Sequence, residues 1–131
     1  MVKSLISKFN IQKLKKKYKN AEPFDHVILD NFWNKKTLNF LEKEIKNFNK
    51  DKKIGVTVYD NEIEKKITCN DYDKFPSNVY QAFTFLNSLT FLNFVKKITG
   101  IKNLIVDIGL HGGGIHIHPN RGKLNIHKDY S

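Results

Sequence analysis

The residues of this chain that could do chemistry are a histidine and a carboxylate near its last position. Residues 122–130 have the sequence Gly-Lys-Leu-Asn-Ile-His-Lys-Asp-Tyr. If this run forms a β-strand, alternate side chains share a face, so Asn125, His127 and Asp129 lie on one side. An imidazole and a carboxylate two strand positions apart can both reach one divalent metal ion. They would supply two of the three ligands in the two-His-one-carboxylate arrangement that binds non-haem Fe(II).

The surroundings of this pair allow two interpretations. A His-x-Asp pair is a weak motif by itself, because two residue types at a fixed spacing occur often by chance. A glycine run at 112–114 and turn residues at 119–122 come just before it, which is typical where backbone approaches a ligand closely. Leu124 and Ile126 are expected to pack behind a polar wall. The same alternation also fits an ordinary surface strand with its polar side in water.

Four of the five histidines lie between positions 111 and 127, which allows a second metal arrangement. His116 and His118 could share a strand face and bind zinc together with His127. A zinc site normally uses three or four close protein ligands, however, and the spacing here matches no zinc finger. The alternative for His116 and His118 is a polar strand edge beside a turn. Cys69 has no convincing partner for thiol catalysis.

Size and composition predict one domain with a packed core. The chain has 131 residues, of which 40% are hydrophobic and ten are Phe. No apolar stretch reaches the ~18–20 residues that would cross a bilayer. A single cysteine cannot form an internal disulfide, so a cytoplasmic location is the simplest expectation.

The positive charge is concentrated at the amino terminus. The formal net charge is +10, and residues 1–20 contain seven Lys and no acidic residue. Arg121 is the only arginine, and because phosphate and guanine contacts favour arginine, nucleic acid is not an expected partner. Leu5, Ile6 and Phe9 have helical spacing, which fits a helix packed on the body or a membrane-surface anchor. We therefore separate a lysine-rich helix or tail, residues 1–20, from a domain over residues 21–131.

Periodicity and capping signals predict an α+β domain. Helices are expected after Asn34, with an apolar face from Leu38 to Phe48, then after Pro76, and finally up to a Gly100 cap. Residues 60–74 are polar and are expected to form a loop. Strands are expected at residues 24–30, 54–58, 104–106, 115–118 and in the run that bears His127. This order is typical of helices that back an antiparallel sheet or jelly roll.

In combination, these features resemble the Fe(II)- and 2-oxoglutarate-dependent dioxygenases, in particular their prolyl-hydroxylase-like branch. The family's opening strand and helix, its helix ending in Thr-Gly-Ile, its Gly-Gly-Gly segment and its His-x-Asp strand occur in the same order here. The matching stretches are residues 23–32, 91–100, 110–116 and 122–129. The resemblance covers nearly all of the chain beyond about residue 20.

The resemblance implies a partial double-stranded β-helix, a cupin-like jelly roll, with supporting amino-terminal helices. It implies that His127 and Asp129 bind iron, that Asn125 contacts cosubstrate or substrate, and that His116 lies at the substrate entrance. The implied cofactors are Fe(II) and 2-oxoglutarate, with ascorbate as an additional one. The implied partners are O2 and a small-molecule or peptide substrate. The C–H bond to be hydroxylated would belong to an amino acid, a peptidyl proline or another small metabolite.

The sequence departs from the family at one point. Family members have a second metal-binding histidine downstream, followed by an Arg or Lys that pairs with 2-oxoglutarate, and neither occurs before Ser131. We therefore expect an amino-terminal piece of a dioxygenase that binds metal weakly and does not turn over. The alternative is a non-catalytic binding module whose basic residues 1–19 contact an acidic partner.

Overall fold

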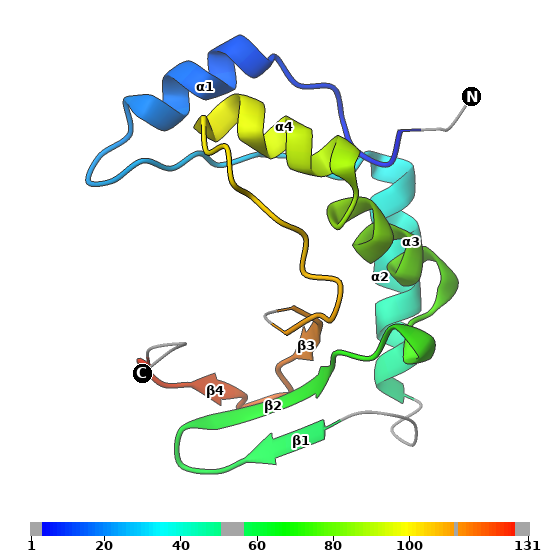
Figure 1. Cartoon of the computed structure of the whole chain (residues 1–131). Helices are drawn as coiled ribbons and strands as arrows, with labels where there is room; N and C mark the ends of the chain where they lie inside the picture. Colours follow the sequence, from blue (N-terminus) through cyan, green and yellow to red (C-terminus); the bar gives the residue numbers. More distant parts are fainter. Residues whose placement is uncertain (1–3, 51–56, 112, 128–131) are drawn as a thin grey trace.

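The computed structural model describes residues 4–50, 57–111 and 113–127. Within these residues the fold is α+β, as predicted, with helices followed by a small antiparallel sheet (Figure 1). The helices are α1 (Ile11–Lys19), α2 (Lys35–Lys50), α3 (Ser77–Leu86) and α4 (Leu89–Thr99), with a 3-10 turn at Tyr72–Lys74. No helix in the described part is long and apolar enough to span a bilayer.

The sheet is organised around one strand. Its strands are β1 (Thr57–Asp60), β2 (Glu64–Cys69), β3 (Ile115–Ile117) and β4 (Lys123–Leu124). β2 pairs antiparallel with the other three. β1 occupies one edge of β2, and β3 and β4 follow one another along the other edge. A turn separates β3 from β4, and in this turn the Gly122 amide donates to the Pro119 carbonyl at 2.7 Å.

The central strand lies where the sequence predicted a loop. Residues 60–74 contain all of β2, so that prediction is wrong. β2 has the sequence Glu-Lys-Lys-Ile-Thr-Cys, in which only Ile67 and Cys69 are apolar. Because charged residues occupy both faces at its start, the strand shows no clear hydrophobic alternation. Its position is set by pairing on both edges.

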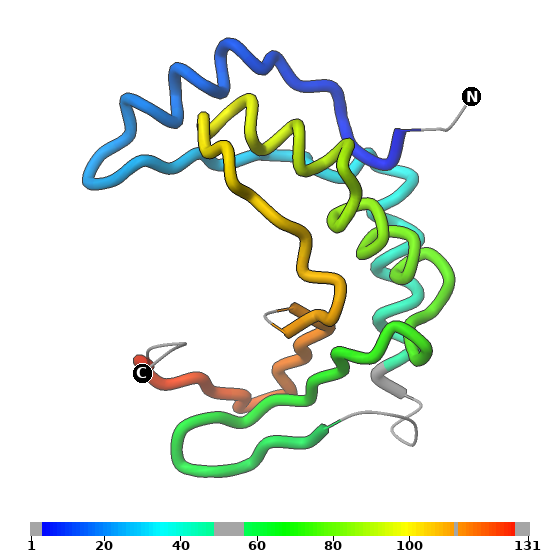
Figure 2. The backbone as a smooth tube through the Cα atoms, in the orientation of Figure 1, coloured from blue at the N-terminus to red at the C-terminus, as the bar shows by residue number. Residues whose placement is uncertain are grey.

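Two predicted strands do not form. Residues 24–30 and 104–106 have no partner strand in the described part of the chain. Instead, residues 100–111 run as an extended connection from α4 to β3 (Figure 2). The side chains of Ile28 and Ile105 are 74% and 90% exposed, so neither segment gains a buried face. The strand predicted at residues 115–118 is confirmed, because β3 falls within it. Of the strand predicted at residues 54–58, residues 57–58 lie in β1, and residues 54–56 lie outside the described residues.

The helix boundaries follow the predicted caps in two cases. The Asn34 carboxamide oxygen accepts the Thr37 amide at 2.9 Å at the start of α2. Gly100 ends α4 with φ 78°, a left-handed conformation that favours glycine. The predicted helix through Leu5 and Phe9 is wrong, because α1 begins only at Ile11.

The core lies between α2, α3 and one face of the sheet. It contains one cluster of buried side chains, to which partly buried aromatic and aliphatic side chains add. The buried members are Leu41, Cys69, Phe75, Val79, Ala82, Leu110 and Ile115. Leu38, predicted to face inward, is 50% exposed.

A second, aromatic cluster attaches the amino-terminal segment to α4. The Phe9 ring lies 6.2 Å from that of Phe32 and 5.8 Å from that of Phe94, centroid to centroid. Phe91 contacts both Phe32 and Phe94. Offset and edge-on aromatic pairs of this kind contribute beyond their buried area. The segment before α1 is therefore part of the folded body.

A carboxylate from α2 caps α3. Glu44 accepts the backbone amides of Asn78 at 2.9 Å and Val79 at 3.0 Å, and the Asn78 side-chain amide at 2.6 Å. These amides belong to the first turn of α3 and have no partner within their own helix. Pro76, the residue at the cap position, supplies no side-chain bond. One side chain thus joins two helices.

Replacement of Glu44 by Gln is expected to lower the free energy of unfolding by roughly 1–2 kcal/mol, because charged acceptors of orphan helix amides are lost. Urea unfolding followed by circular dichroism measures the change. Glu42→Gln is the matched control, since Glu42 is on the same helix and contacts only Lys46 on the surface. Equal stability of the two variants would contradict the capping role.

Candidate functional site

The predicted metal pair lies just beyond β4. The strand ends at Leu124, and the Asn125 amide still donates to the Ile63 carbonyl at 2.9 Å. His127 follows without regular secondary structure, and its side chain is exposed. Asp129 lies outside the described residues. The shared face of His127 and Asp129 therefore stays a prediction.

The His127 ring is oriented by its own backbone. Its Nδ1 lies 2.8 Å from the Asn125 carbonyl oxygen. A carbonyl oxygen can only accept, so Nδ1 carries the proton and Nε2 carries the lone pair in the neutral ring. Histidines that bind metals commonly donate their second ring N–H in this way. The geometry thus selects the tautomer that a metal ligand needs.

Asn125 is held against the turn between β1 and β2. Its side-chain nitrogen donates to the Glu62 carbonyl at 3.0 Å. The Lys123 ammonium donates to the same carbonyl at 2.8 Å. The predicted contact of Asn125 with cosubstrate or substrate is not tested by this arrangement, which instead gives Asn125 a role in fixing the chain before His127.

The aliphatic support predicted behind the pair is absent from the described residues. Leu124 is 46% exposed and Ile126 is fully exposed. The sequence interpretation placed both against a core, and this was wrong. The sheet ends at β4, so no helix or second sheet covers these side chains among the described residues.

Polar side chains gather on the sheet face opposite to that of the buried Cys69 and Ile115. Glu64, Lys66 and Thr68 alternate with Ile67 and with Cys69, which belongs to the core, and His116 pairs with Thr68. The Lys66 ammonium lies 2.6 Å from the Glu64 carboxylate, and their side chains are only 15% and 18% exposed. The Lys66 ammonium also lies 5.3 Å from the Tyr59 ring centroid. We call Glu64, Lys66, Thr68 and His116 the polar face.

The electrostatics of the polar face act on His116. Burial lowers the pKa of its imidazole below the usual range, and the neighbouring Lys66 and His118 lower it further. The Glu64 carboxylate acts in the opposite direction. His116 therefore favours the neutral form, in which it can accept a hydrogen bond or bind a metal.

Gly114, just before β3, allows the chain to pass close to the β2 backbone. A Cβ on Gly114, which has φ 154°, would lie 2.7 Å from the Cys69 carbonyl oxygen and 3.3 Å from the Asn70 Cα. The sequence interpretation linked these glycines to close approach of a ligand. In the structure the close approach of Gly114 is to the β2 backbone, and Gly112 lies outside the described residues.

The zinc arrangement is not assembled. Over residues 4–50, 57–111 and 113–127, no group of three or more His, Cys, Asp or Glu side chains could hold a metal ion. His116, His118 and His127 are all among these residues. Their placement therefore gives no support to a shared zinc site.

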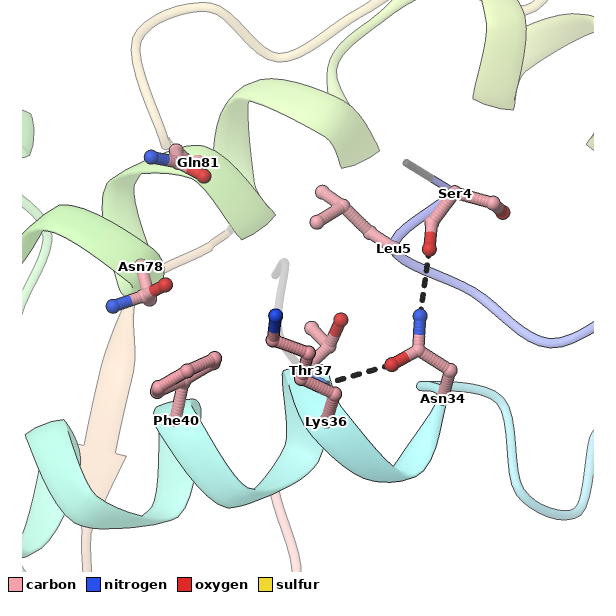
Figure 3. Close-up of a pocket in the computed structure, with 8 residues that line it drawn as sticks. All are labelled: Ser4, Leu5, Asn34, Lys36, Thr37, Phe40, Asn78 and Gln81. Atoms are coloured by element: carbon pink, nitrogen blue, oxygen red, sulfur yellow. Dashed lines mark hydrogen bonds between the residues drawn. The ribbon is translucent and has the colours of Figure 1, made fainter. Parts of the chain in front are cut away.

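Cavities also lie on the helical body. One of about 340 Å³ opens between α2, α3 and β3, and Gly114, Ile115 and His116 line its sheet side. Another of about 400 Å³ lies where α2 begins, and its polar groups come from Ser4, Lys36 and four residues in or next to α2 and α3 (Figure 3). Those four are Asn34, Thr37, Asn78 and Gln81. None of the predicted site residues lines this second cavity.

The sequence interpretation missed the Glu64–Lys66 pair, because residues 60–74 were expected to form a loop, and it assigned no role to Tyr59. Alternation of Glu64, Lys66 and Thr68 was the available signal. Comparison of the chain with family models, curated proteins and solved structures found no match.

The lowered pKa of His116 predicts a stability that depends on pH. Above about pH 6.5, the ordinary histidine pKa, neither state is protonated at this position. As the pH falls below that value the unfolded chain binds the proton first, so stability declines until the lowered folded pKa is passed. Urea unfolding at a series of pH values should show a shallower decline for His116→Gln. His118→Gln should reduce the decline less, and an unchanged slope in His116→Gln would refute the assignment.

Gly114→Ala is expected to destabilise the fold by roughly 2 kcal/mol, because the methyl group meets backbone and φ is unfavourable. Gly113→Ala is the control, since its nearest neighbour would be a Leu110 methyl at 3.5 Å. Thermal unfolding of both variants measures the difference. A similar melting temperature for the two would mean that β2 and β3 tolerate a shift here.

Proposed function

We propose that this chain forms part of an Fe(II)- and 2-oxoglutarate-dependent oxygenase, with the sheet as part of a double-stranded β-helix. The observation that carries the proposal is the orientation of His127, whose Nδ1–H is directed to the Asn125 carbonyl. With Nδ1 donating to that carbonyl, Nε2 would be the atom that binds the metal. Asp129, two residues further on, would supply the carboxylate.

The layering of the domain separates the polar face from Asn125. α2 and α3 back one face of the antiparallel sheet, and the other face carries charged and hydrogen-bonding groups. In the register of β4 with β2, however, Leu124 pairs with Glu64 of the polar face, so Asn125 and, by alternation, His127 belong to the other face. The proposed place of His116 at the substrate entrance therefore rests on the family resemblance and not on the polar face.

The residues of this chain would hold and orient the metal. The Asn125 carbonyl fixes the His127 ring, and hydrogen bonds from Asn125 and Lys123 to Glu62 fix the backbone that precedes it. Fe(II) with 2-oxoglutarate would supply the oxidising chemistry that side chains lack, which is hydroxylation of a substrate C–H bond with O2. The substrate class is an amino acid, a peptidyl proline or another small metabolite.

The chain by itself is expected to bind Fe(II) weakly and not to turn over, because two ligands leave most of the coordination sphere to water. Anaerobic titration with Fe(II) in the presence of 2-oxoglutarate, followed by absorption of the metal–cosubstrate complex, measures this. His127→Ala and Asp129→Ala should each weaken binding at least about tenfold, since direct ligands matter no less than their supporting groups.

His26→Ala is the matched control. His26 makes the same local contact, with Nδ1 2.8 Å from the Phe24 carbonyl oxygen, but no carboxylate lies two residues further on. The Fe(II) affinity of His26→Ala should equal that of the unmodified protein. Equal Fe(II) affinities of His127→Ala and the unmodified protein would exclude the proposed site.

A further inference from the structure

The carboxyl-terminal ends of α1 and α4 meet at one end of the molecule (Figure 1). Both helices carry lysines in their last turns, and Lys102 lies three residues after the end of α4. We call these side chains the lysine cluster: Lys13, Lys15, Lys16, Lys17, Lys19, Lys96, Lys97 and Lys102. The only carboxylates in the adjoining segments 10–25 and 89–106 are those of Glu22 and Asp25, so these segments carry a net charge of +6.

The lysines point away from the body because α1 uses its other side for packing. Leu14 is buried, and Ile11 and Tyr18 are half-buried, on the side that contacts α4. All five α1 lysines are exposed. Within the described residues no ammonium group of the cluster forms an ion pair. The charge is therefore uncompensated and available to a partner.

Exposed apolar side chains accompany the lysines. Phe24 lies in the segment that leaves α1 and is 68% exposed, and Ile101 directly follows α4 and is 47% exposed. Figure 1 shows both segments leaving from the end where the two helices terminate. Lysines around an exposed aromatic and an aliphatic side chain are typical of surfaces that lie on a lipid headgroup layer.

We propose that this end of the molecule binds an anionic phospholipid surface. Lysine ammonium groups would contact the headgroup phosphates, and Phe24 and Ile101 would enter the interface. The contact differs from the anchor considered from sequence, because Leu5, Ile6 and Phe9 are half-buried in the body. Nucleic acid fits less well, since the only arginine, Arg121, lies in the turn before β4. The proposal does not depend on the oxygenase activity.

Sedimentation with vesicles tests the proposal. Vesicles of phosphatidylcholine with about one third phosphatidylserine should bind the protein at about 0.1 M salt, whereas pure phosphatidylcholine should not. Each lysine near such a surface contributes roughly a fivefold factor, so the triple variant K16Q/K17Q/K97Q should bind about a hundredfold more weakly. Phe24→Ser should also weaken binding, with a loss that persists at high salt.

The control variant K35Q/K43Q/K74Q removes the same charge from exposed positions outside the cluster and should bind as the unmodified protein does. An equal loss in both triple variants would overturn the proposal, because net charge alone would then explain binding. Absence of binding to the anionic vesicles would overturn it too. Tighter binding to duplex DNA than to these vesicles at the same salt would assign the cluster to nucleic acid instead.

Discussion

The pairing of β2 on both of its edges holds the two halves of the described fold together. β1 follows α2 in the chain, β3 and β4 come after α4, and all three find their partner in β2. Without β2 the segment after α4 would have no ladder to join. Cys69 of β2 and Ile115 of β3 then connect the sheet to the core beneath α2 and α3. Backbone hydrogen bonds fix this strand more than its own hydrophobicity does.

One consequence is a sheet with two unlike faces. The inner face shares a core with two helices, and a Glu44 carboxylate joins those helices to each other. The outer face keeps a partly buried Glu64–Lys66 pair beside His116. A buried ion pair contributes little to net stability, because desolvation offsets attraction.

The lysine cluster is physically separate from the polar face. It depends on the packing of α1 against α4 and on the aromatic cluster that holds the amino-terminal segment. The polar face depends on strand pairing. Each proposal can therefore fail without affecting the other.

The sequence by itself determined the features that depend on local chemistry. Asn34 and Gly100 cap α2 and α4 as predicted, because the bonds involved span only a few residues. The α+β class also follows from periodicity. The His127 tautomer, by contrast, depends on a contact that residue types alone do not show, although it too is local.

Tertiary structure decided which extended segments become strands. Residues 24–30 and 104–106 have better strand composition than β2, yet only β2 finds partners on both edges among the described residues. Tertiary structure also brings Glu44 to the start of a helix more than thirty positions away. It places Lys66 beside Glu64, Tyr59 and His116. Strand pairing and such contacts join residues distant in the chain, so their energies depend on the whole fold and leave little trace in local sequence.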